Sequence, residues 1–259
     1  MKSLSKDLPK NLPKNLPKLW GPGVNPSRDE EPRTLAGRVA KQLRIDIIRH
    51  HLAPGERLQF EKLGKRYKVG ISPLREALFQ VAAQGLVVAE DHKGFFVAPV
   101  HFDEMLDVSN LRANLETYAL RGSIQDGRED WEVDLLAAFH RLKLAGIAVS
   151  ADQEDEDRRT EWEDRHRDFH YALCKGCGSP WLLHFFNELY DHMERYRRYF
   201  WKYAERAVAA DSEHEAIMKA ALDRDEERAT NLLQAHFRRQ AKLTMTLRSK
   251  VERATAAAE

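Results

Sequence analysis

The fold of this chain is decided by the stretch Leu63-Gly64-Lys65-Arg66-Tyr67-Lys68-Val69-Gly70-Ile71-Ser72-Pro73-Leu74-Arg75-Glu76-Ala77-Leu78. It predicts a short helix near residues 61–67, a turn that contains Gly70, and a second helix. Ser72 can cap the second helix, and Pro73 fits its first turn, where a missing N–H breaks no intrahelical hydrogen bond. Two short helices joined by a tight turn are typical of a helix-turn-helix, whose second helix enters a major groove of DNA.

The residues on either side extend this motif into a winged helix-turn-helix domain. Upstream, apolar residues at helical spacing predict a helix over 35–47, and Pro54-Gly55 predicts a turn after it. Downstream, residues 86–89 and 95–98 are rich in β-prone residues and flank Asp91-His92-Lys93-Gly94, a pattern that predicts a hairpin. Such a hairpin is a wing, and it places Lys93 where it can contact phosphate or the minor groove.

Residues 34–99 resemble the winged-helix domain of the GntR superfamily. The resemblance rests on ordered PGxxL, PxREAL, GL and GxxV elements, and it implies a homodimer that binds double-stranded operator DNA. Two departures concern DNA contacts. Gly70 and Ile71 stand where members usually carry Ser-Arg, and Glu61 stands where another Arg is common. The operator sequence of better-known members therefore does not transfer to this chain.

The candidate DNA contacts lie on the two short helices and on the wing. Arg75 matches the family's contact, and its alternative role is an ion pair with a carboxylate on the helix surface. The lysines and Arg66 are candidate partners of phosphate, contacts that position a protein without specifying sequence. The full set of predicted DNA-binding residues is Lys62, Lys65, Arg66, Ser72, Pro73, Arg75, Lys93 and Gly94.

Composition describes a soluble chain with an uneven distribution of charge. The 259 residues are 42% hydrophobic and 32% charged, with a formal net charge of +1. Basic residues gather in the helix-turn-helix, whereas acidic residues gather between positions 152 and 164. No apolar run approaches the length of a membrane span and no secretory signal is visible, so we expect a cytoplasmic protein without a membrane partner. Residues 1–32, with their Leu-Pro-Lys repeats, predict a flexible tail.

After residue 100 the strand signals almost vanish, and the sequence predicts an all-α domain over residues 101–250. A short C-terminal tail over 251–259 follows it. The single Cys174-x-x-Cys177 pair is most simply explained by packing at a helix end, with redox switching or a zinc half-site as alternatives. Glycines 122, 127, 146 and 178, together with Pro180, are predicted breaks between helices. The six predicted helices span residues 103–121, 130–147, 155–175, 179–203, 211–223 and 225–250. The fold class is thus mainly α: a winged helix-turn-helix followed by an antiparallel helical bundle.

Four histidines occupy the core-facing sides of three of these predicted helices. His166 and His170 are one turn apart and share a face, whereas His214 and His236 lie on the last two helices. Interior imidazoles need partners for their nitrogens, and a shared divalent metal would satisfy all four. Imidazole suits zinc, nickel or another transition metal, and zinc is our first expectation. The alternative is that each histidine is separately hydrogen-bonded.

Residues 103–245 resemble the FCD ligand-sensing domain of FadR-type GntR regulators. Phe169-His170, His214 and His236 match that domain's metal ligands, but His166 stands where an Asp is usual. The segment from Gly178 further looks like the CsiR-like branch, whose members sense small dicarboxylates such as glutarate. The resemblance implies that Arg112 contacts a carboxylate effector. Arg112 could instead form only an i,i+4 ion pair with Glu116.

Together the two domains predict a ligand-responsive transcriptional regulator, a repressor released by a small carboxylate or dicarboxylate. We do not expect an enzyme, although inward-facing histidines keep a metal-dependent hydrolase or lyase as one alternative. A catalytic metal would need a poised acid or base, and Glu163 is a weak candidate. The other alternative is a constitutive DNA-binding dimer whose helical domain only dimerises.

Overall fold

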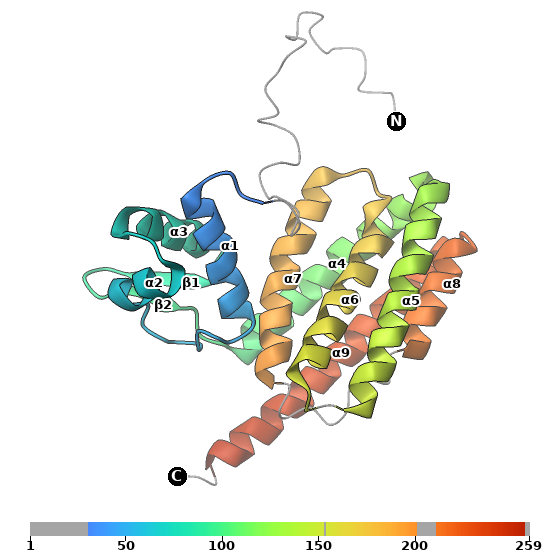
Figure 1. The fold of residues 1–259 in the computed structure, drawn as a ribbon. Helices are drawn as coiled ribbons and strands as arrows, with labels where there is room; N and C mark the ends of the chain where they lie inside the picture. Colours follow the sequence, from blue (N-terminus) through green and yellow to red (C-terminus); the bar gives the residue numbers. More distant parts are fainter. Residues whose placement is uncertain (1–30, 153, 201–210, 257–259) are drawn as a thin grey trace, which may run out of the picture.

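The computed structural model describes residues 31–152, 154–200 and 211–256, which form two domains (Figure 1). The N-terminal domain contains three helices and a hairpin: α1 (Leu35–Ile48), α2 (Phe60–Tyr67), α3 (Ile71–Ala83), β1 (Val87–Glu90) and β2 (Gly94–Val97). The helical domain follows with α4 (Phe102–Asp126), α5 (Glu129–Ala151), α6 (Glu156–Lys175), α7 (Pro180–Phe200), α8 (Asp211–Leu222) and α9 (Glu226–Ala256). The predicted fold class, winged helix-turn-helix plus helical bundle, is confirmed.

The N-terminal domain is held together by the apolar faces of α1 and α3. Leu43 and Ile47 of α1 and Leu74 and Leu78 of α3 are fully buried in one cluster. Burying each such side chain contributes roughly 1.5–3 kcal/mol. The start of α1 is capped by Thr34, whose hydroxyl accepts a hydrogen bond from the Gly37 N–H at 3.0 Å. This core fixes the orientation of α3, the helix that the motif assigns to the major groove.

The start of α3 differs from the sequence expectation. The helix begins at Ile71, and its N-cap is Gly70 in extended backbone without a side-chain hydrogen bond. Ser72 therefore lies inside the first turn and does not cap the helix, whereas Pro73 is in the first turn as expected. The preceding turn is made by Lys68, which adopts the left-handed conformation (φ 55°) and closes α2 by donating its N–H to the Gly64 carbonyl.

The predicted wing is an antiparallel hairpin of β1 and β2. Glu90 pairs with Gly94 next to the tip, and Val87 pairs with Val97 at the base. Gly94 has φ 102°, a conformation open to glycine, so this residue allows the tight turn after Lys93. Arg57 forms an isolated antiparallel bridge with Phe96, which ties the hairpin to the segment before α2.

The six predicted helices of the second domain are all present among the described residues, but two predicted breaks are wrong. Gly122 and Gly146 lie inside α4 and α5. A Cβ on Gly122 would lie only 3.1 Å from the Cβ of Cys177, so this glycine allows close packing and does not end the helix. The last helix also continues to Ala256, through residues predicted as a C-terminal tail. No helix in the described residues is long and apolar enough to cross a bilayer.

Helix α7 joins the two domains, and Figure 1 shows it beside α1. Arg195 of α7 donates to the Ala98 carbonyl at 2.7 Å, and His192 Nε2 donates to the Gln84 carbonyl, at the end of α3, at 2.8 Å. The carboxylate of Asp191 lies 3.0 Å from Arg44 of α1. The N-terminal domain is therefore docked on the helical domain by buried polar contacts.

Candidate metal centre and nucleic-acid interface

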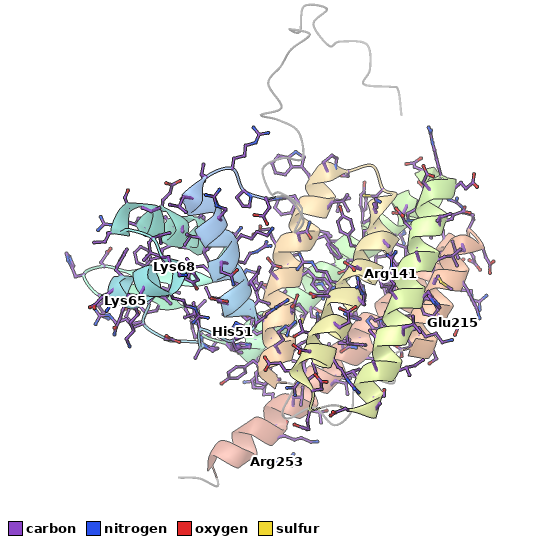
Figure 2. The ribbon with its side chains drawn as sticks, viewed as in Figure 1. His51, Lys65, Lys68, Arg141, Glu215 and Arg253 are labelled. Carbon is purple, nitrogen blue, oxygen red and sulfur yellow. The ribbon has the colours of Figure 1, made fainter. Side chains whose placement is uncertain are left out.

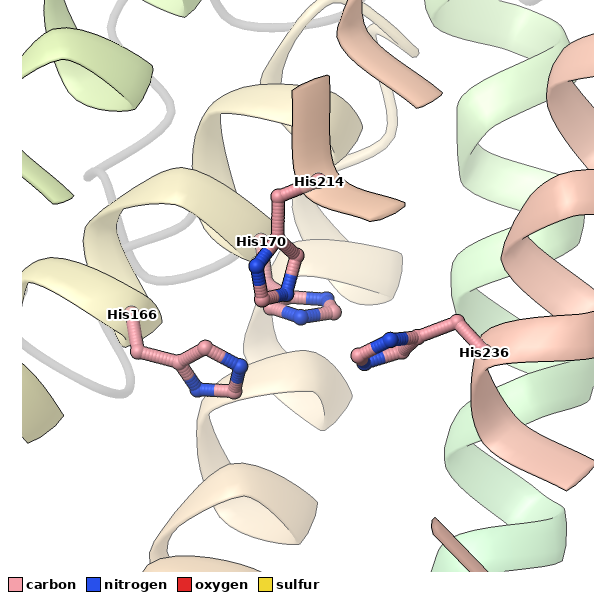
Figure 3. A group of neighbouring side chains, drawn as sticks. All are labelled: His166, His170, His214 and His236. Carbon is pink, nitrogen blue, oxygen red and sulfur yellow. The ribbon is translucent and has the colours of Figure 1, made fainter. Parts of the chain in front are cut away.

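The four predicted histidines converge in the middle of the helical domain (Figure 3). His166 and His170 come from α6, His214 from α8 and His236 from α9. One nitrogen from each ring lies within 4.8 Å of the others, and all four side chains are at most 5% exposed. Three helices thus present four imidazoles to one point inside the core.

A layer of oxygen atoms orients three of these rings from outside. His170 Nδ1 donates to Glu116 Oε2 at 2.7 Å, and His236 Nδ1 donates to Glu213 Oε2 at 3.0 Å. His166 Nδ1 lies 2.7 Å from the Tyr190 hydroxyl. Metal-binding histidines commonly use their second nitrogen in this way, because the outer partner fixes ring orientation and tautomer. The Nε2 atom of His170 is buried and has no hydrogen-bond partner within the described residues.

Burial keeps the imidazoles of His166 and His170 in the neutral form that a metal requires. Desolvation lowers the pKa of His170 to about 4, although the Glu116 carboxylate opposes this change. The pKa of His166 is held well below its usual range by burial and by the neighbouring His170. Burial alone would raise the pKa of Glu116, but Arg112 and His170 reverse this and lower it. At neutral pH the centre therefore offers nitrogen lone pairs beside an ionised carboxylate.

The predicted DNA-binding residues lie on the N-terminal domain, away from the histidines. Arg75 is exposed, and its guanidinium lies 5.8 Å from the Phe60 ring. No carboxylate in the described part of the chain pairs with Arg75, so the alternative ion pair is not present here. Figure 2 labels Lys65 and Lys68 by α2, at the outer side of this domain. Arg75 is thus free to meet a ligand outside the protein.

The other basic candidates differ in how firmly they are held. Lys65 pairs with Glu61 at 2.8 Å and Lys93 with Glu90 at 2.9 Å, but both lysine side chains are more than 70% exposed. Such surface pairs are worth at most about 1 kcal/mol, so a phosphate can replace them. Arg66 instead lies 2.9 Å from Asp46, a buried acid of α1, and it helps to hold α2 in place. The structure assigns Arg66 a structural contact that the sequence did not reveal.

Comparison with known proteins finds a family match in each of the two domains. The model of bacterial regulatory proteins of the gntR family matches residues 35–97, and the FCD domain model matches residues 107–239. The chain is 39% identical to the uncharacterized HTH-type transcriptional regulator BphR of Paraburkholderia xenovorans, over 79% of this chain and 83% of that protein.

This chain belongs to the GntR family, with an FCD domain.

Two further comparisons support the family and the fold. This GntR-family regulator is 37% identical to the HTH-type transcriptional repressor GlaR of Escherichia coli, over 75% of this chain and 89% of GlaR. Among solved structures, E. coli McbR/YncC superposes with a TM-score of 0.68 at 18% identity, covering 82% of this chain and 98% of the other. That structural likeness concerns the fold alone. The matched proteins and domains are transcriptional regulators and not enzymes.

The predicted effector residue Arg112 is buried in the helical domain of this GntR-family regulator. Its Nε donates to Glu116 Oε1 at 2.9 Å, so the i,i+4 ion pair considered above is present. Its guanidinium also lies 4.3 Å from the centre of the Tyr190 ring. Glu116 also accepts a hydrogen bond from His170, so Glu116 connects Arg112 to the histidine cluster. Its contact with an effector stays a prediction.

Glu163, the weak candidate for a catalytic acid or base, already pairs with an arginine. Glu163 accepts three hydrogen bonds from Arg197: from Nε at 3.2 Å on Oε1 and 3.1 Å on Oε2, and from Nη2 at 2.7 Å on Oε2. A carboxylate held in this way by a guanidinium is not available to take a proton from a substrate. The arrangement gives no support to the enzyme alternative.

The outer layer of the histidine cluster was missed by sequence reasoning. Tyr190 and Glu116 come from α7 and α4, far from the histidines in the chain, and only packing brings them together. Glu213 directly precedes His214 but contacts His236 instead, and it also pairs with Arg239. A local signal existed only for Glu116, which lies four residues after Arg112. Asp168, although only two residues before His170, pairs with Arg165 on the surface at 3.2 Å.

Proposed function

We propose that this regulator is a metal-dependent repressor that releases its operator when a small carboxylate binds in the helical domain. The observation that carries the proposal is the cluster of four buried imidazoles with carboxylates behind two of them. GlaR of E. coli, which covers most of this chain, is named a repressor, and this supports the sign of regulation. The functional unit is a homodimer, because a palindromic operator presents two half-sites related by a twofold axis.

The chemistry of the residues fits a divalent transition metal. All four candidate ligands are imidazoles, which suit zinc, nickel or a related ion and not calcium or magnesium. His166, His170, His214 and His236 would hold the ion, with zinc as our first candidate. The Nε2 of His170 has no partner in the part of the chain that the structure describes, and this supports the assignment because a buried polar atom ordinarily has a partner. A bound ion of this kind supplies a positive charge and open positions that attract carboxylate oxygens.

Arg112 is the protein group best placed to assist the effector. Its guanidinium is fully charged, 3% exposed and adjacent to the outer layer of the histidine cluster. An effector carboxylate that reached this region would compete with Glu116 for the same guanidinium. We propose that this exchange releases Glu116, and with it His170, from their present positions.

Helix α6 offers a route from the effector site to the DNA-binding domain. It carries His166 and His170 on one face and Arg167 on another, where Arg167 lies 2.5 Å from Asp191. The other oxygen of Asp191 pairs with Arg44 on α1. A small shift of α6 would therefore change the docking of the N-terminal domain. Coupling of this kind is reciprocal, so bound operator must weaken the effector by the same factor.

The test is fluorescence anisotropy on the chain's own upstream DNA at fixed salt, with zinc-loaded protein and a panel of C2 to C6 mono- and dicarboxylates. We expect tight binding without an acid and release by at least one acid. Release must disappear in Arg112→Gln, whereas operator binding without acid must persist. Arg141→Gln, a change on an exposed arginine of α5, is the matched control. Tight binding that no acid relieves would favour a constitutive DNA-binding dimer.

Arg75→Ala should weaken specific operator binding more than binding to random DNA. A side chain that forms a bidentate contact to a base is worth about 1–3 kcal/mol of discrimination, a loss of roughly tenfold to a hundredfold. Lys62→Ala, on the neighbouring helix, should instead weaken both DNAs equally, since a phosphate contact carries no sequence information. Binding constants for both DNAs at one salt concentration check this. Equal losses in Arg75→Ala would mean that Arg75 contacts only the backbone.

A further inference from the structure

The junction between the two domains contains a cavity that the proposed function does not use. Its volume is about 210 Å³, and a water molecule occupies about 30 Å³ in the liquid. Helix α6 and the end of α7 form one wall, and the residues that follow α1 form the other. The four buried histidines are not among its lining residues. The cavity is therefore separate from the candidate metal centre.

Basic side chains from both domains line this cavity. Arg49 and His50 come from the N-terminal domain, Arg159 from α6 and Arg198 from α7. The Nη2 of Arg49 reaches Asp164 only at 3.7 Å, and Arg198 uses Nε for Glu194 and Nη1 for Thr160. Arg159 forms no ion pair within the described residues. The three guanidinium groups thus retain donor capacity.

Three buried nitrogen atoms here have no hydrogen-bond partner among the described residues. They are Nε of Arg49, Nη2 of Arg198 and Nδ1 of His50. Buried polar atoms are satisfied in the great majority of cases, by protein groups, by ordered water or by another bound molecule. Unpartnered atoms from two domains around one cavity are therefore positioned to bind a polar ligand. Two of the three can only donate hydrogen bonds, because a guanidinium has no acceptor.

His50 adds information about the kind of ligand. Its Nε2 lies 2.8 Å from the Arg195 carbonyl, which can only accept, so Nε2 carries the proton. Burial and the nearby Arg195 and Arg198 lower the pKa of His50, and the neutral ring then leaves Nδ1 as an acceptor. The site thus offers guanidinium donors for negative oxygens and one acceptor for an O–H group.

The acidic residues that line the cavity do not prevent it from binding an anion. Glu163 is bound by Arg197 through three hydrogen bonds, so its charge is already compensated. Glu156 is exposed to solvent at the start of α6, where water screens its charge. Tyr199 completes the wall, with its ring 5.6 Å from that of His50. A compact anion beside Arg49, Arg159 and Arg198 is therefore compatible with the acids present.

We propose that the domain junction is a second ligand site, specific for a small tetrahedral oxyanion that keeps one O–H, namely hydrogen phosphate. Its charged oxygens accept from Arg49, Arg159 and Arg198, and its O–H donates to His50 Nδ1. Because the two walls belong to different domains, bound phosphate holds the N-terminal domain against α6 and α7. The site is independent of the metal, since none of the four histidines contributes to it.

Isothermal titration calorimetry with inorganic phosphate on the full-length protein tests this, at constant ionic strength maintained with chloride. We expect saturable binding of one phosphate per chain, in protein with and without a metal-chelating treatment. Arg159→Gln should weaken binding at least tenfold. Arg158→Gln, which removes an equal charge from the adjacent exposed position paired with Asp155, should leave it unchanged. Equal losses in both variants, or no saturation in the wild type, would overturn the site.

Two further measurements test the junction and the chemistry of the ligand. Arg49→Gln should weaken phosphate as strongly as Arg159→Gln, because both walls contribute; a normal affinity in Arg49→Gln would refute a site shared between domains. Sulfate, which has the same shape but no O–H at neutral pH, should bind at least tenfold more weakly than phosphate. Equal affinities for the two anions would refute the assignment to hydrogen phosphate. Far-ultraviolet circular dichroism confirms that each variant is folded.

Discussion

Replacing His170 with alanine is expected to abolish one-to-one metal binding and the thermal stabilisation that the metal provides. His170 is 1% exposed, and its Nε2 is left unpartnered within the described residues while its Nδ1 is held by Glu116. A ligand that binds only the folded state stabilises it by about 4 kcal/mol at a thousand times its Kd. The variant should lose this stabilisation by the metal completely. Atomic emission spectroscopy and thermal unfolding, with and without added zinc, measure the two effects.

The control for this variant is His140→Ala, which removes an exposed histidine of α5 and should leave metal content unchanged. Glu116→Gln should weaken metal binding without abolishing it, because it keeps the shape of the side chain but removes the carboxylate behind His170. Loss of such an outer partner typically costs 10-fold to 100-fold in metal affinity. A His170→Ala protein that still holds one zinc per chain would remove the histidine cluster from the proposed function.

Replacing Asp191 with asparagine should destabilise the protein by about 3–5 kcal/mol, the usual cost of leaving a buried charge without its partner. Its two carboxylate oxygens lie 3.0 Å from Arg44 and 2.5 Å from Arg167, and all three side chains are less than 10% exposed. The variant would leave two buried guanidinium groups facing a neutral amide. Urea denaturation followed by circular dichroism measures the change in the free energy of unfolding.

Asp134→Asn is the matched control for this prediction. Asp134 pairs with Lys175 at 2.5 Å, but both side chains are about half exposed, so water already solvates the pair. We expect a change below about 1 kcal/mol. If the two variants lost equal stability, the Asp191 network would be no more important than a surface ion pair, and the proposed route from α6 to α1 would lose its basis.

Local sequence signals predicted the elements of the N-terminal domain more accurately than those of the helical domain, for a physical reason. In the N-terminal domain, turn residues and apolar spacing predicted three helices and a hairpin, because those signals act over a few residues. The error at Ser72 arose because Gly70, two residues earlier, adopts the extended conformation of the N-cap. In the helical domain, the breaks expected at Gly122 and Gly146 were wrong. Gly122 packs closely against Cys177 in the turn between α6 and α7, and such a glycine looks the same in sequence as one that ends a helix.

The sequence by itself determined the fold class, the family, and the faces on which four histidines lie, since helical periodicity places His166 and His170 one turn apart. Only the tertiary structure decided what surrounds them. Tyr190, Glu116 and Asp191 act on residues 24 to 147 positions away, as do the contacts that build the cavity at the domain junction. Such partners are chosen by the packing of whole helices, and no spacing within one helix encodes which distant side chain will meet another.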